Sequence, residues 1–322
     1  MTTPRNHWTD VNEKTSVWGI RFLFRLYDLC GRLTFWLMLA PVTFFYWIMD
    51  ARCRNSSLKY LQLAHRAGFL VKKPGLSTSY VHLFTFSDTI LDKFIAIWGT
   101  HSLPELEIEN ESALTQYISQ CQSCVVLCSH CGCIEALMRY ANFNVSSPII
   151  ALIHSGHSKQ FRQMLAQSPS LKNVQFMEVS ELTPATIGQL EEDVKKGALI
   201  FIAGDRVPIS SQSKALCELE FLGQKAFFPI GSVLISNLFH LPLVSMTSWR
   251  TQSANLLHPN RPNRYHVRFK QLCSEVKLSR SMRQAQCADI MQKYVQEIEH
   301  GLKKSPLDWF NFFDFWHPPE KQ

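Results

Sequence analysis

Apolar and polar positions divide the 322-residue chain into two parts. In the first hundred or so residues, apolar side chains recur mainly at helical spacing, whereas beyond Cys124 short apolar runs alternate with helical patterns. Pro104 and the acidic stretch from Glu105 to Glu111 separate the two patterns. We therefore predict an N-terminal helical region over residues 1–104 and an α/β domain over residues 105–322.

The most apolar segment runs from Val17 to Asp50. It begins as an amphipathic pattern, and from Leu33 to Met49 it contains no charged residue, which gives about 17 residues, the lower limit for spanning a bilayer. Pro41 is expected to bend this helix, and basic residues on both sides leave its orientation undecided. The segment fits a membrane helix that spans or lies in the interface, or a buried helical hairpin that caps the domain. Two further helical patterns cover residues 56–67 and 77–98.

The second part alternates between short apolar runs and helical patterns, which predicts a mostly parallel central sheet covered by helices on both faces. The expected strands cover residues 125–129, 149–153, 174–179, 198–203, 243–248 and 265–269. The expected helices cover residues 135–143, 159–167, 184–196, 232–239 and 279–302. The last residues, from Pro306 to Trp316, are dense in aromatic side chains.

Charge and cysteine content narrow the functional classes. The net charge is +7, but no Lys/Arg block is interleaved with aromatic residues, so the sequence does not indicate a nucleic-acid partner. A mild positive excess favours an anionic membrane face or an acidic protein. The ten cysteines are expected to be reduced and the protein intracellular, because residues 1–15 lack the features of a signal peptide.

The candidate chemistry lies where the first strand of this part ends. His130 follows the apolar run Val125–Ser129, and Glu135 lies five residues further on. Two residues five apart on one helix diverge, so the pair can meet only if His130 ends the strand and Glu135 lies in the first turn of the next helix. Gly132 would allow the tight turn between them. A carboxylate bonded to one imidazole nitrogen leaves the other free as a general base, whereas the alternative is a loop histidine and a helix-start acid.

Five cysteines surround the same histidine, at positions 121, 124, 128, 131 and 133. Thiolates and a histidine at such spacing can bind zinc or an iron–sulfur cluster, which would make the chain a non-catalytic metal- or partner-binding membrane protein. Strand alternation, however, sends Cys124 and Cys128 to one face and leaves Cys131 and Cys133 beyond its end. We therefore favour packing and expect no metal site. A lowered pKa of Cys131 at a helix start is a further alternative.

A second candidate turn, Gly204-Asp205-Arg206, follows the apolar run Ala198–Ala203. In open α/β sheets ligands bind beyond the carboxyl ends of the strands. Arg206 could hold a phosphate there, with Asp205 to position it, unless the two form a surface pair. His154 and His157 follow another strand and are alternatives as pocket residues or ordinary loop histidines.

Taken together, these motifs resemble the lysophospholipid acyltransferase superfamily, whose signature is a histidine and an acid separated by four residues. The likeness is to its bacterial lipid A late-acyltransferase-like branch, and within it to acyltransferases of aryl-polyene and polyketide clusters. The motifs that carry it are His7-Trp8, Gly19 to Leu23, Leu91-Asp92-Lys93-Phe94, Ser129-His130-x-Gly132, Gly204 to Pro208, Phe221-Leu222-Gly223, Phe228-Pro229-x-Gly231, Leu241 to Val244 and Trp309 to Trp316.

The resemblance implies a direct acyl transfer from an acyl carrier protein or coenzyme A thioester to a hydroxyl or amine of a lipid-type acceptor. His130 would be the general base and Glu135 would orient it, with no cofactor. Gly132, Arg139, Gly204, Asp205 and Arg206 would lie on the substrate side. The implied location is the cytoplasmic face of a bacterial inner membrane. The sequence departs from the glycerolipid branch in having Ser129 in place of Asn and Glu135 in place of Asp, and it lacks a clear Glu-Gly-Thr block, which argues against a glycerol-phosphate acceptor.

Overall fold

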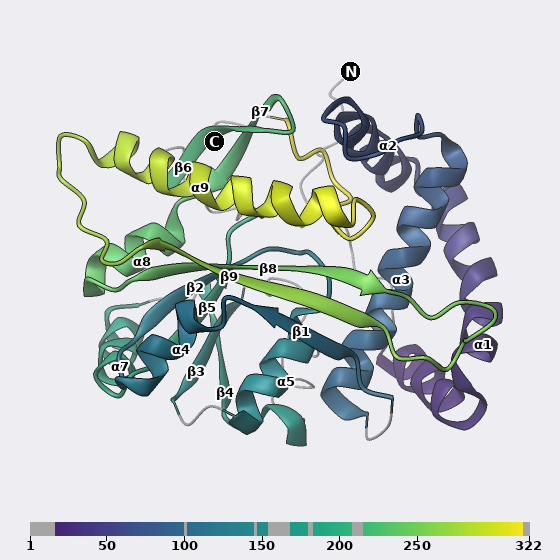
Figure 1. The fold of residues 1–322 in the computed structure, drawn as a ribbon, viewed down its shortest axis with the longest axis horizontal. Helices are drawn as coiled ribbons and strands as arrows, with labels where there is room; N and C mark the ends of the chain where they lie inside the picture. The colour runs from purple at the N-terminus through teal and green to yellow at the C-terminus, as the bar shows by residue number, and fades with distance from the viewer. Residues whose placement is uncertain are drawn as a thin grey trace.

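The computed structural model describes residues 17–99, 102–144, 147–153, 168–179, 183–207 and 215–317 (Figure 1). Its main sheet has seven strands in the order β1-β9-β8-β2-β5-β3-β4. All neighbouring pairs are parallel except β8 and β9. These strands are β1 (Glu105–Glu109), β2 (Cys124–Cys128), β3 (Ile149–Ile153), β4 (Val174–Glu178), β5 (Leu199–Ala203), β8 (Leu243–Gln252) and β9 (Arg264–Cys273). The mostly parallel α/β sheet that the sequence predicts is confirmed.

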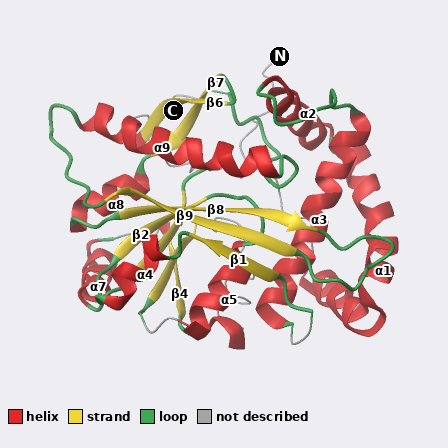
Figure 2. Cartoon of the chain, viewed as in Figure 1, coloured by secondary structure: helices red, strands yellow, loops and turns green. Residues whose placement is uncertain are grey.

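Helices cover both faces of this sheet (Figure 2). The core on one face joins residues of α2, α8 and α9 with the antiparallel hairpin β6–β7, and the core on the other face joins residues of α4, α5 and the end of α3. These elements are α2 (Ala51–Arg66), α3 (Leu76–Trp98), α4 (Ser112–Ser119), α5 (Ile134–Asn144), α7 (Pro184–Lys195), β6 (Leu216–Phe221), β7 (Gln224–Pro229), α8 (Gly231–Phe239) and α9 (Arg283–Lys304), with a 3-10 turn at Pro169–Leu171.

Strand β2 lies between β8 and β5 and forms the middle of the molecule. Its five residues are all buried, and alternate side chains enter different cores, with Val125 and Leu127 on one face and Val126 on the other. A strand buried on both faces reads as a continuous apolar run, which is why it was recognisable in the sequence. Its carboxyl end delivers the chain to His130.

Helix α1 (Val17–Met49) has a break at Gly31, where φ is 77° and ψ is 178°, which the sequence did not predict; Pro41 lies inside the helix, and the bend expected there stays a prediction. Residues Arg25–Met49 are long and apolar enough to cross a membrane, and only 22% of their most apolar window is buried. A helix that caps a soluble domain would bury its apolar face, so this exposure favours a membrane helix over the buried-hairpin interpretation. Helices α1, α2 and α3 stand together at one end of the sheet (Figure 1).

Several elements were not foreseen in the sequence, and helix α4 is one of them. The acidic stretch that we took for a boundary forms β1 at the edge of the sheet, where Leu106 and Ile108 alternate with three glutamates. Charged residues are common on edge strands because they oppose pairing with other chains. The hairpin β6–β7 was also missed. The helix expected over residues 159–167 lies outside the described residues.

Candidate active site

The position of His130 follows from the register of two neighbouring strands. Cys128 at the end of β2 is aligned with Ala203 at the end of β5. His130 and Asp205 each lie two residues beyond these partners, so the chain brings them to the same level at the carboxyl edge of the sheet. The Nδ1 atom of His130 is 2.6 Å from Oδ1 of Asp205. The backbone N–H of His130 donates to Oδ2 of the same carboxylate at 2.8 Å.

Asp205 is buried, and each of its carboxylate oxygens accepts hydrogen bonds. Besides the His130 backbone, Oδ2 accepts from the side-chain amide of Asn311 at 2.9 Å and from the indole N–H of Trp309 at 3.3 Å. Burial alone would raise the pKa of Asp205, but the charge and hydrogen bonds of His130, with the nearby charge of Arg206, lower it to about 2. The group is therefore a carboxylate at neutral pH.

His130 keeps its second ring nitrogen available. Its side chain is 31% exposed, and no hydrogen-bond partner for Nε2 is found among the described residues. Burial and the charge of Arg206 lower the pKa of His130 and outweigh the opposite effect of Asp205. With Nδ1–H donating to an ionised carboxylate, Nε2 carries the lone pair of a neutral imidazole. The arrangement is that of a general base held by an acid.

The C-terminal segment Ser305–His317 forms the other wall of this site. The backbone N–H of Phe310 donates to the carbonyl of His130 at 3.0 Å, and Cys131 forms a bridge with Trp309. Arg206 donates from Nε to the Asn311 side chain at 2.8 Å and from a terminal nitrogen to the Phe310 carbonyl at 3.0 Å. The segment therefore holds both His130 and the carboxylate that supports it.

The family model described as "Bacterial lipid A biosynthesis acyltransferase" matches residues 84–317, from α3 to the end of the C-terminal segment. The chain belongs to this family. It is an acyltransferase.

The sequence has no match among curated proteins. Among solved structures, the fold is similar to that of the 1-acyl-sn-glycerophosphate acyltransferase PlsC from Thermotoga maritima, with 11% sequence identity and a TM-score of 0.35. That likeness covers 84% of this chain and 97% of the PlsC chain.

Glu135 of the acyltransferase does not make the contact that we expected. It lies in the first turn of α5 as predicted, but its Oε1 accepts from Nζ of Lys93 on α3 at 2.9 Å, and His130 is bonded to Asp205 instead. The physical reason is the strand register, which places Asp205 beside His130. The second carboxylate oxygen of Glu135 is buried and has no hydrogen-bond partner among the residues that the structure describes.

Two glycines shape the turns of the acyltransferase site. Gly132 has φ of 58°, and a Cβ there would lie 2.6 Å from Ser248 Oγ, so the expected tight turn after His130 requires glycine. Gly204 precedes Asp205, and a Cβ at this position would overlap the side chain of Leu127. Its backbone N–H donates to the carbonyl of Cys128 at 2.9 Å, which extends the pairing of β2 and β5 up to the two functional residues.

Arg139 takes part in the packing of α5 on α3. Its guanidinium donates to the carbonyls of Ala96 and Gly99 at the end of α3, and to Ser170 Oγ at 2.7 Å. It also lines a hollow of about 530 Å³ between α3, α5 and β1, together with apolar residues that include Leu106, Ile108 and Ala136. Arg139 thus closes the end of a helix and borders a cavity, and its contact with substrate stays a prediction.

The cysteines near His130 enter separate parts of the core. Cys124 and Cys128 share one face of β2 as predicted, whereas Cys131 and Cys133 belong to two other apolar clusters. Among the described residues, no group of three His, Cys, Asp or Glu side chains is placed to hold a metal ion. Burial raises the pKa of Cys131, contrary to the lowered value considered from its position before a helix. His154 and His157 lie outside the described residues.

The sequence assigned Asp205 to the substrate side and did not single out Lys93, Trp309 or Asn311 for the site. Asp205 and Lys93 stand in motifs that carried the family resemblance, and Trp309 and Asn311 stand in the aromatic tail. No local pattern tells which strand ends share an edge of the sheet. The available signals were the place of Asp205 just after an apolar run and a resemblance that spans nearly the whole chain.

Proposed function

We propose that this acyltransferase moves a fatty or polyene acyl group from an acyl carrier protein or coenzyme A thioester to a hydroxyl or amine of a lipid-type acceptor at the membrane. The observation that carries the proposal is the His130 imidazole, which is held at Nδ1 by an ionised, buried carboxylate and available at Nε2. Transfer from a thioester needs one base near the acceptor and no resident cofactor.

In the proposed reaction, His130 carries the proton from the acceptor to the leaving group. Nε2 takes the proton of the acceptor hydroxyl or amine while the acceptor oxygen or nitrogen bonds to the thioester carbonyl carbon. The carbon–sulfur bond then breaks, and the imidazolium returns the proton to the departing thiolate. Asp205 stabilises the imidazolium between these steps and remains a carboxylate throughout.

In this proposal Glu135 acts through Lys93 and not through His130. Lys93 is 25% exposed on its side chain, and its charge reaches the His130 imidazole. We propose that Lys93 binds an anionic group of a substrate, such as a phosphate, and that Glu135 holds Lys93 in place. Gly132 and Gly204 shape the turns on the substrate side, and Arg206 supports Asp205 and Asn311.

The donor and the location follow from charge and from helix α1. The net charge of +7 favours an acidic acyl carrier protein over coenzyme A as the donor. Such donors occur in the cytoplasm, so the active site would face the cytoplasmic side of a bacterial inner membrane. The apolar, mostly exposed helix Arg25–Met49 supports attachment to that membrane.

The test is transfer by purified variants from a labelled acyl thioester to an extracted membrane lipid. Loss of the base in His130→Ala should lower the rate about 10²–10⁴-fold. The control is His240→Asn, because His240 is exposed and precedes β8 at the opposite, amino-terminal end of the parallel strands. Mass spectrometry of lipids from cells with and without the protein would identify the product. Wild-type transfer rates in His130→Ala would refute the proposed base.

A further inference from the structure

The loop between β8 and β9 exposes two adjacent leucines. Leu256 is 78% exposed and Leu257 is 86% exposed. The loop, residues 253–263, contains no acidic residue; His258 follows the leucines directly and Arg261 comes three residues later. Two large apolar side chains at the tip of a projecting loop are costly in water, so a surface of this kind points to a partner.

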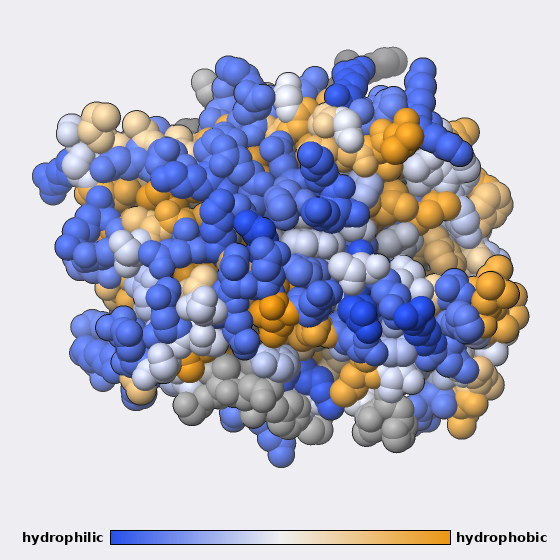
Figure 3. All heavy atoms as spheres, viewed as in Figure 1, coloured by the Kyte–Doolittle hydropathy of each residue, from blue (hydrophilic) through white to orange (hydrophobic). Residues whose placement is uncertain are grey.

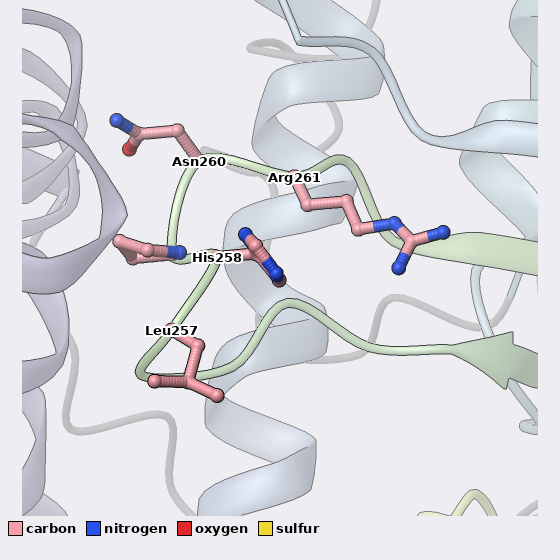
Figure 4. A pocket seen from close by; sticks show the side chains of 5 residues that line it. Leu257, His258, Asn260 and Arg261 are labelled. Atoms are coloured by element: carbon pink, nitrogen blue, oxygen red, sulfur yellow. The ribbon is translucent and has the colours of Figure 1, made fainter.

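The loop is built to hold its leucines outward. The Asn255 side-chain oxygen accepts from the backbone N–H groups of Leu257 and His258, both at 3.0 Å. At the base of the loop, Arg261 donates to Gln252 at 2.5 Å. Figure 4 shows Leu257 at the end of the loop, whereas Arg261 reaches back beside the strands. The exposure of the leucines is therefore set by a turn with its own hydrogen bonds.

The same loop is fixed to the N-terminal helices. Asn263 accepts from Ala254 at 2.6 Å and donates to Asp92 of α3 at 2.6 Å. Arg32 of α1 binds the same Asp92 in a buried ion pair. At the neighbouring turn of α1, Asn260 lies so close to Gly31 that a Cβ there would be 2.8 Å from its Oδ1. These contacts thus fix the position of the loop relative to α1.

Helix α1 presents an apolar surface beside this loop. Figure 3 shows hydrophobic side chains gathered at the edge of the molecule where α1 and the β8–β9 loop meet. The exposed large apolar residues of the helix are Leu29, Leu33, Leu37, Met38, Val42, Phe44, Phe45, Tyr46, Ile48 and Met49. The leucines of the loop extend this surface beyond the helix.

We propose that the β8–β9 loop is a second membrane contact, in which Leu256 and Leu257 enter the apolar layer while His258 and Arg261 lie among anionic lipid headgroups. The projecting shape of the tip, its lack of acidic residues and its continuity with the apolar helix favour a lipid surface over a second copy of the chain. The inference deepens the proposed function, because it fixes which edge of the enzyme faces the bilayer.

The decisive experiment is photocrosslinking on vesicles of phosphatidylcholine and phosphatidylglycerol. The full chain is made with p-benzoylphenylalanine in place of Leu257 or, as the control, in place of Met282. Met282 is 55% exposed and precedes α9, at the end of the molecule away from α1 (Figure 1). We expect phospholipid adducts at position 257 and none at position 282, as measured by mass spectrometry of the crosslinked peptide.

A partition measurement gives the size of the effect. Replacing both leucines in Leu256→Ser/Leu257→Ser should weaken binding to these vesicles roughly tenfold or more, because two large apolar groups leave the bilayer. The matched variant Leu238→Ser/Met282→Ser removes two exposed apolar residues from the other end of the molecule and should bind as the wild type does.

Other outcomes overturn the inference. Vesicle-bound protein without lipid adducts at position 257, equal adducts at both positions, or protein–protein adducts at position 257 would each exclude a lipid contact by this loop. Failure to bind vesicles at all would do the same. His130→Ala should give the wild-type crosslink without acyl transfer, so the membrane contact and the proposed chemistry fail independently.

Discussion

At the residue scale, His130 and Asp205 depend on two neighbouring backbones more than on their own sequence surroundings. Each lies two residues beyond the last aligned pair of β2 and β5. Gly204 keeps those backbones close, because a Cβ there would overlap Leu127. The Asp205 carboxylate accepts hydrogen bonds from Asn311 and Trp309, so its orientation is fixed before any substrate arrives. Such preorganisation makes an ionised acid effective beside a base.

Replacing Asp205 and Glu135 one at a time distinguishes the roles of the two carboxylates. Asp205→Asn removes the charge that raises the pKa of His130, and it should lower kcat at least about 100-fold, within the range for a general base. Its residual activity should titrate at a lower pH than that of the wild type. Glu135→Gln disturbs Lys93 instead and should shift the pH of half-maximal activity less than Asp205→Asn does, because Asp205 contacts the imidazole and Lys93 acts on it only through its charge. The measurement is kcat and KM against pH for both variants, and a pH shift confined to Glu135→Gln would reverse the assignment.

The pH dependence of the wild type follows from His130. A base must be neutral to accept a proton, and burial and Arg206 lower the pKa of this imidazole below its usual 6.5. The transfer rate should therefore be level near neutral pH and fall only as the pH decreases through that lowered value. Initial rates measured from pH 4.5 to 8 would show this decrease. The protein at each pH should recover full activity on return to neutral pH, so that acid unfolding does not cause the decrease. A midpoint above 6.5 would contradict the electrostatic picture.

At the scale of elements, the C-terminal segment is part of the candidate active site and more than an aromatic cap. It binds His130 through Phe310 and both Asp205 and Arg206 through Asn311. Its rings pack into the core beside β6 and α2, as the contacts of Trp309 with Phe221 and Tyr60 show. The packing of these aromatic residues thus holds the segment on the core and fixes the position of Asn311.

Asn311→Ala tests this role. The variant leaves one Asp205 oxygen with fewer donors and removes an acceptor of Arg206, which should cost about 2 kcal/mol of stability and lower kcat roughly tenfold with little change in KM. Lys59→Ala is the control, because it also removes contacts between α2 and the segment, a part-exposed ion pair with Asp314 and a cation–π contact with Trp316, but none of the hydrogen bonds described above for Asp205 or Arg206. Rates and thermal unfolding would be compared. Equal kcat values for the two variants would assign Asn311 a packing role alone.

The elements were predictable to different degrees. Strand β2 was predicted from its continuous apolar run, and helix α9 was predicted from a long helical pattern. β1 was missed, since three glutamates at an edge resemble a polar linker. The pairing of His130 with Asp205 was beyond local patterns, because it depends on β5 lying next to β2 in the sheet. The two residues are 75 positions apart in the chain. Glu135 was expected because a strand end followed by a helix start could bring it to His130, and because its spacing matches the histidine–acid signature of the family that the sequence resembles.

At the scale of the whole molecule, buried polar groups join the N-terminal helices to the catalytic edge. Arg32 and Arg250 bind Asp88 across three elements, at 3.4 and 2.9 Å. His82 of α3 lies between Ser57 of α2 and the Trp309 carbonyl of the C-terminal segment. The family match begins at residue 84, yet these contacts make the preceding helices structural partners of the site.

His82 gives the molecule a pH-dependent stability. Its Nε2–H donates to the Trp309 carbonyl at 2.9 Å, so Nδ1 accepts from Ser57 at 3.0 Å and the ring is neutral. Burial lowers its pKa to about 4. Because the unfolded chain binds this proton near pH 6.5, stability contributed by the neutral ring is complete above that pH and is lost as the pH falls toward 4, by about 3 kcal/mol.

The measurement is denaturant unfolding of the wild type and His82→Gln between pH 4 and 7.5. Glutamine offers one donor and one acceptor without a titrating group, so the variant should be less stable at pH 7.5 but should lose less stability on acidification. His130 also has a lowered pKa and contributes to the same window in both proteins, whereas Asp205 titrates near pH 2, outside it. The difference between the two curves therefore isolates His82. Parallel curves would show that this histidine does not couple the helices to the site through its protonation.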